Sequence, residues 1–162
     1  MKEMDVVGVR VELPSKQPVV LLHETAGDRY LPIWIGTVEA AAIAYHHNET
    51  PLPRPLTHDL LGDVIETLGA TLDRVEIVDL KEAVFFAELV IDGETRVSSR
   101  SSDAIALALR SHVPILCSDE VLDAAGVNLP DSEEEEVERF RRFLSEVEPE
   151  DFEEESGPGG PA

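Results

Sequence analysis

Cysteine is almost missing from this chain, because Cys117 is the only one among 162 residues. A single cysteine cannot form an internal disulfide. Cys117 follows two apolar residues in what reads as a short strand. We therefore expect a buried, small hydrophobic side chain there rather than a reactive thiol.

Aromatic residues and long apolar runs are also scarce. Aromatic side chains make up 5% of the chain and hydrophobic residues 43%, so the core must be aliphatic. No run reaches the roughly 18 to 20 apolar residues of a membrane span. The first residues, MKEMD, carry acidic side chains where a signal peptide has a basic and then an apolar region. These absences predict a cytoplasmic location and no membrane partner.

Positive charge is the third shortage. The 13 Lys and Arg residues face 34 Asp and Glu residues, which gives a net charge of −21. Residues 1–130 contribute −11 of this charge and residues 131–162 contribute −10. An acidic domain disfavours a nonspecific grip on phosphate backbones. Phosphate-binding Gly-rich loops, paired Cys/His zinc patterns, Gly-x-Ser-x-Gly elbows and basic RNA-binding segments are absent as well.

The length suits one domain, and the composition changes after Pro130. We predict a domain over residues 1–130 and an acidic tail over 131–162. In that tail, Phe140, Phe143 and Leu144 indicate one short amphipathic helix, and the charged stretch beyond Pro149 is typical of disorder. The tail is expected to be dispensable for folding.

Alternating β-branched residues predict strands over residues 5–13, 19–22, 30–35, 75–78, 84–91 and 95–99, and one ending at residue 117. In the first strand, Val7, Val9 and Val11 are expected on one face. Asp92-Gly93 is a strong two-residue hairpin signal. Trp34 is expected to pack in the core, with an oligomer contact or a base-stacking platform as the alternative.

Helices are predicted over residues 38–47, 57–69, 103–111 and 119–125. Thr57 is expected to cap the second helix, Ser101 or Ser102 the third, and Ser118 the fourth. Leu60, Val64 and Leu68 at i, i+4 and i+8 make the second helix amphipathic, and the apolar run AIALAL buries the third. Strands without regular βαβ alternation predict an α+β fold, a single domain with a mixed, largely antiparallel sheet packed by helices.

Three segments carry a specific pattern: LPIWIG at residues 31–36, RPLTHDL at 54–60 and SRSSDAIALALR at 99–110. In order and spacing they resemble the bifunctional nuclease family, whose members are described as cutting both DNA and RNA. The likeness spans roughly residues 3–126. Where the family has an acid and a proline around the arginine of the third segment, this chain has Ser98 and Ser101.

The resemblance implies a nuclease for DNA and RNA, with hydrolysis assisted by Mg²⁺ or another divalent cation. Asp59 and Asp63 lie four residues apart, so both carboxylates could reach one cation, although a solvated helix face explains them too. The candidate catalytic residues are His58, Asp59 and Asp103. Arg54 and Arg100 are the candidate phosphate-binding residues.

All five of these catalytic and phosphate-binding candidates lie at helix N-termini or in the loops before them, where anion sites are built. We therefore expect them to converge on one cleft. For Glu39 and Asp103, a favourable interaction with the helix dipole is the simpler explanation. The side chains of His46 and His47 point about 100° apart around the helix axis, so one is expected to face the protein interior and the other solvent.

A second interpretation is a noncatalytic, oligomeric binding or regulatory module, which recognises a protein or small anion near Arg54 and Arg100. The acidic composition favours it. In either case we expect a homo-oligomer, most simply a dimer.

Overall fold

The computed structural model describes residues 1–12 and 14–128, so the acidic tail predicted over 131–162 lies outside the described residues. The elements, in chain order, are β1 (Lys2–Glu12), β2 (Gln17–Glu24), β3 (Arg29–Trp34), α1 (Thr37–His47), α2 (Thr57–Thr67), β4 (Leu72–Lys81), β5 (Val84–Ile91), β6 (Thr95–Arg100), α3 (Ser101–Ser111), β7 (Ile115–Cys117), α4 (Asp119–Ala125) and β8 (Val127–Asn128).

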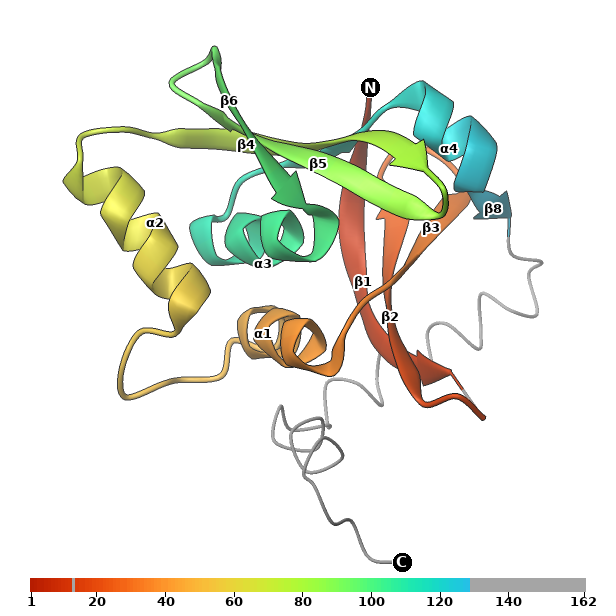
Figure 1. The fold of residues 1–162 in the computed structure, drawn as a ribbon, viewed down its shortest axis with the longest axis horizontal. Coiled ribbons are helices and arrows are strands. Elements are labelled where there is room, and N and C mark those ends of the chain that lie inside the picture. Colours follow the sequence, from red (N-terminus) through yellow and green to blue (C-terminus); the bar gives the residue numbers. More distant parts are fainter. Residues whose placement is uncertain (13, 129–162) are drawn as a thin grey trace, which may run out of the picture.

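One eight-stranded sheet organises the domain, in the order β6-β5-β4-β7-β1-β2-β3-β8 (Figure 1). The pairing of β4 with β7 is parallel and every other pairing is antiparallel. The prediction of an α+β domain with a mixed, largely antiparallel sheet is confirmed. The Asp92-Gly93 hairpin is also confirmed, because both residues have the positive φ angles, 51° and 80°, that such a turn requires.

The predicted face of β1 is wrong for Val7, although Val9 and Val11 both pack on the main core as expected. Val7 belongs to a small cluster with Leu21 and Tyr30, whereas Val9 belongs to the main core. The register with β2 shifts between Val6 and Gly8, which marks a β-bulge. Since a bulge adds one residue to one strand, it exchanges the inward and outward positions that simple alternation assigns.

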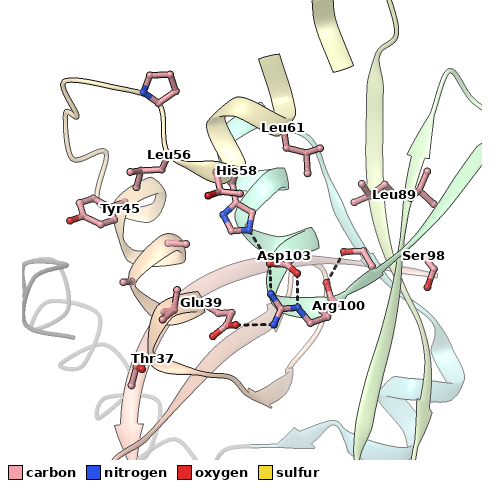
Figure 2. Close-up of a pocket in the computed structure, with 17 residues that line it drawn as sticks. Thr37, Glu39, Tyr45, Leu56, His58, Leu61, Leu89, Ser98, Arg100 and Asp103 are labelled. Atoms are coloured by element: carbon pink, nitrogen blue, oxygen red, sulfur yellow. Dashed lines mark hydrogen bonds and ion pairs between the residues drawn. The ribbon is translucent and has the colours of Figure 1, made fainter. Parts of the chain in front are cut away.

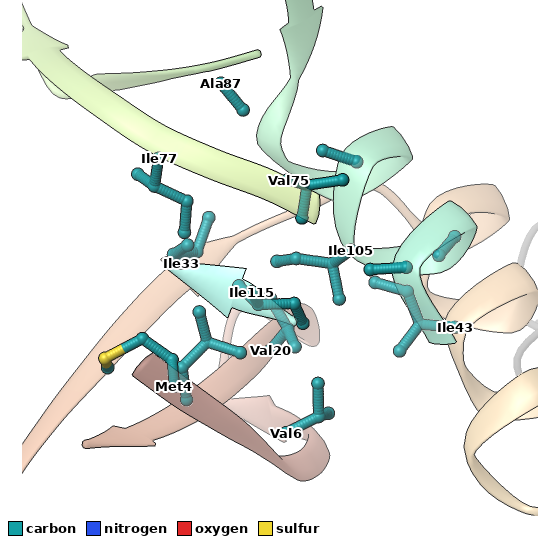
Figure 3. Close-up of a cluster of buried hydrophobic side chains, with 14 of the residues drawn as sticks. Met4, Val6, Val20, Ile33, Ile43, Val75, Ile77, Ala87, Ile105 and Ile115 are labelled. Carbon is teal, nitrogen blue, oxygen red and sulfur yellow. The ribbon is translucent and has the colours of Figure 1, made fainter. Parts of the chain in front are cut away.

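The main core lies where α1 and α3 pack against the sheet (Figure 3). α1 contacts β1 and β2, and α3 contacts β4 and β5. As predicted, α3 is buried nearly all round, with Ile105 and Leu107 fully inaccessible. Cys117 is buried as predicted, and burial raises the pKa of its thiol to about 12.

Helix α2 differs from its prediction in two ways. Leu56, not Thr57, precedes the first helical residue, and its N–H donates to Asp59 Oδ2 at 2.9 Å. In addition, α2 packs mainly on α3 and stands away from the sheet (Figure 1). The apolar side chains that we call the α2 stripe therefore remain exposed: Leu60, Leu61, Val64 and Leu68.

Trp34 is not a core residue, because 49% of it is exposed at the end of β3. Both alternatives for Trp34, an oligomer contact and a base-stacking platform, require this exposure. Within the described residues, every helix is too short or too polar to span a membrane.

Candidate functional site

An open pocket of about 950 Å³ lies where the first turns of α1, α2 and α3 face β5 and β6 (Figure 2). Its walls are mostly aliphatic, including Leu56, Leu61, Leu89 and Val97. The charged and titratable side chains that line it come from three different helices or their first residues: Glu39, His58, Arg100 and Asp103.

Arg100 contacts two of the other charged side chains in this group. It is the last residue of β6 and immediately precedes α3, so its backbone is fixed by both elements. Its Nε and Nη2 donate to the two carboxylate oxygens of Asp103 at 2.6 and 3.0 Å. Its Nη1 donates to Glu39 Oε1 at 2.8 Å. Even so, 66% of the Arg100 side chain is exposed, so the guanidinium can be reached from solvent.

His58 completes the group from α2. Its Nε2 lies 3.0 Å from Asp103 Oδ1, although 45 residues separate the two in the chain. The side chain of His58 is 14% exposed and that of Asp103 is 29% exposed, so the pair is largely shielded. A carboxylate that holds one ring nitrogen of histidine leaves the other nitrogen available for proton transfer.

Asp103 is kept as a carboxylate by its neighbours. Burial alone would raise its pKa, but hydrogen bonds from Arg100 and His58 outweigh burial, and the pKa is lowered. Its contribution to stability is therefore present above the usual aspartate pKa and is lost as the pH falls through the lower folded-state value. At neutral pH the ionised Asp103 carboxylate can accept a hydrogen bond from the His58 ring and so orient that ring.

Asp59 does not line the pocket. Its carboxylate points to a second group of charges behind the site, with His46 Nε2 at 3.6 Å and Arg110 Nε at 3.8 Å. Asp63 forms an ion pair with the same Arg110. Of the five residues expected in one cleft, the structure thus brings together His58, Arg100 and Asp103. Arg54 is exposed in the loop before α2 and is also outside the lining.

The acidic face of α2 does not fit a divalent cation as it stands. The Arg110 guanidinium contacts the carboxylates of both Asp59 and Asp63, and a shared cation would have to displace it. Across residues 1–12 and 14–128, no three His, Cys, Asp or Glu side chains are grouped to hold a metal ion. Metal binding at Asp59 and Asp63 stays a prediction, which titration of the protein with Mg²⁺ can test.

Two residues of these charge groups were not assigned from the sequence. Glu39 was explained by the helix dipole, yet it pairs with Arg100 across 61 residues. Arg110 follows the apolar run of the third predicted helix, and no sequence pattern marked it as a functional residue. Neither spacing nor composition reveals such distant partners; the position of the candidates at helix N-termini indicated that the segments meet, but not which side chains pair.

Comparison with known proteins agrees with this arrangement. The bifunctional nuclease domain matches residues 20–130, a range that contains α1, α2, α3 and the whole pocket. Two curated relatives, both named as uncharacterized proteins of Mycobacterium tuberculosis (strains CDC 1551 / Oshkosh and ATCC 25618 / H37Rv), are 52% identical over 161 residues. Each alignment covers 94% of this chain and 98% of the relative. The chain therefore belongs to the bifunctional nuclease domain family.

Proposed function

We propose that this protein hydrolyses phosphodiester bonds in DNA and RNA, with the pocket between α1, α2 and α3 as its active site. The observation that carries the proposal is the contact between His58 and Asp103. A histidine oriented by a partly buried carboxylate in an open pocket is an arrangement suited to general acid–base catalysis. The family membership supplies the substrate class.

Each residue of the pocket takes a distinct role in this proposal. His58 removes a proton from the water whose oxygen bonds to phosphorus, and Asp103 holds its ring. The P–O bond to the leaving sugar oxygen then breaks, and that oxygen takes up the proton held by His58 or one from solvent. Arg100 binds a phosphate oxygen by exchanging its Glu39 contact for the substrate, which its exposure permits. Arg54 contacts phosphate from the loop before α2. Asp59, whose contacts are to Leu56, His46 and Arg110, supports the start of α2 and does not touch substrate.

Mg²⁺ or another divalent cation stays part of the wider hypothesis, because the family resemblance implied it. When bound, such a cation would neutralise charge on the phosphate. None of the roles given to His58, Arg100 and Asp103 depends on it. The protein is proposed to act in the cytoplasm.

The alternative is a noncatalytic binding or regulatory module. It is favoured by the charge of the pocket, where Arg100, the one Lys or Arg among the described lining residues, is already paired with two carboxylates, Glu39 and Asp103. Protein purified free of host nucleases separates the two interpretations. Cleavage of DNA or RNA that depends on His58 supports the enzyme, and binding without cleavage supports the module.

A homodimer is proposed in both cases, and the α2 stripe supports it, since Leu60 is 55% exposed and Leu68 is 79% exposed. A closed twofold assembly would bury one stripe against the other. We expect light scattering at about tens of micromolar protein, above the dissociation constant of a modest interface, to give a dimer. Leu68→Glu should shift it to monomer, while Val84→Glu, on an exposed part of β5, should not. A monomeric parent protein would contradict the proposal.

A further inference from the structure

A second charged group lies behind the pocket and is centred on Arg110 in the last turn of α3. Its guanidinium forms an ion pair with Asp63, and it lies 3.8 Å from Asp59 Oδ1 and 3.9 Å from Glu66 Oε1. Asp59, Asp63 and Glu66 are spaced four and three residues apart, so they lie along one face of α2. A favourable interaction with the α3 dipole would explain a basic residue in this turn, but not three carboxylates aligned on it.

Gly62 allows the guanidinium to lie close against α2. It is the one fully buried residue of that helix. A Cβ atom at this position would stand 2.6 Å from Arg110 Nη1 and 3.0 Å from its Cζ. Glycine costs stability inside a helix relative to alanine, and here the missing Cβ leaves the space that the Arg110 guanidinium occupies.

The Arg110 group also reaches α1. His46 lies in the last turn of α1, and its Nε2 is 3.6 Å from Asp59 Oδ1. Burial lowers the pKa of His46; Asp59 acts in the opposite direction, and His58, Arg110 and His112 add to the lowering. One connected group of side chains therefore links all three helices.

The same three helices provide three of the polar side chains of the pocket. α1 carries Glu39, α2 carries His58 and α3 carries Asp103, whereas the Arg110 group lies further along each helix. The step from Asp103 to Arg110 is seven residues, or about 10 Å along the helix. Within one chain, helix α2 has little else to fix it against α1 and α3, because its apolar stripe faces away from them and Ile65 is only partly buried.

We propose that Arg110 is a positioning residue, which docks α2 against α1 and α3 and so places His58 within hydrogen-bond distance of Asp103. Its role in activity rests on the proposed nuclease function. Its role in docking does not, and the two can be measured separately. The planar guanidinium holds its five donors in a fixed geometry, whereas a compact ammonium group on a flexible stem holds several carboxylates less rigidly and an apolar side chain cannot pair with them.

The direct test is Arg110→Met in the full chain, with Arg29→Met as the matched control. Arg29 also pairs with two carboxylates, Glu24 and Asp123, but it lies in β3, away from α2. For Arg110→Met we expect amide hydrogen exchange in residues 57–67 to rise at least about tenfold, with the β4 and β5 amides unchanged. The long-range ¹H–¹⁵N signals of the His58 ring should also shift. Arg29→Met should change neither.

Two further variants keep the proposal falsifiable if Arg110→Met fails to fold. Asp63→Asn removes the same ion pair from the α2 side, so it should speed exchange in α2. Arg110→Lys should restore part of the protection. If the nuclease function holds, kcat should fall by up to about 100-fold in Arg110→Met, as for other misplaced catalytic groups, with KM little changed. Unchanged α2 exchange and unchanged His58 signals in these variants would overturn the proposal, whatever the cleavage assay gives.

Discussion

We expect His58→Ala to lower the rate of cleavage of single-stranded DNA and RNA by about 10²- to 10⁴-fold, the range typical of a removed general base. The loss should appear in kcat, because the His58 ring is 14% exposed and its Nε2 is already used by Asp103. Arg100 is untouched, so KM should change little. The melting temperature should stay close to that of the parent, because His58 lies in the first turn of α2 and outside the hydrophobic core.

The matched control for this variant is His23→Ala. His23 lies in β2 with its ring tilted against that of Tyr30, with 4.5 Å between the ring centres, and it is not part of the pocket lining. The control should keep full activity. Equal activity in His58→Ala and the parent would mean that a contaminating nuclease or another site is responsible.

The largest expected effect on stability is that of Ile105→Ala. Ile105 is fully buried in α3, in the core between α1 and the strands β4 and β5. Removing three carbon atoms there leaves a cavity and should lower the free energy of unfolding by about 2 to 5 kcal/mol. Denaturation in urea measures this directly, with the midpoint shifted and the slope unchanged.

The control for the core variant is Val84→Ala at the start of β5. Val84 is 55% exposed, so its truncation should cost no more than about 1 kcal/mol, the span of strand propensities. Equal losses for the two variants would show that α3 does not form the centre of the core.

The sequence predicted most elements of this fold because local signals and tertiary packing agree there. The apolar run of α3 is buried as expected, and the Asp92-Gly93 turn joins β5 to β6. Failures occurred where a long-range feature overrides a local pattern. The bulge near Gly8 reverses the phase of β1, and Trp34 lies at an exposed strand end. The hydrophobic periodicity of the sequence indicates neither the bulge nor the exposed position of Trp34.

The candidate site was predictable in part for a similar reason. His58, Arg100 and Asp103 stand beside helix starts, and such positions bring polar groups together whenever the helices pack side by side. Asp59 also lies near a helix start, but its carboxylate points toward Arg110. That partner comes from the neighbouring helix α3, so the local sequence around Asp59 does not reveal it. The amphipathic pattern of α2 correctly indicated a helix, yet it could not tell whether the apolar face meets this chain or a second one.

A double-mutant cycle on His58 and Asp103 tests the central claim most directly. Single-turnover cleavage rates would be measured for the parent, His58→Ala, Asp103→Asn and the double variant, on the same DNA and RNA substrates. If the pair acts as a unit, the double variant should be about as slow as His58→Ala alone, because Asp103 works through the ring it holds. Fully multiplicative losses, or a double variant as active as the parent, would contradict the account.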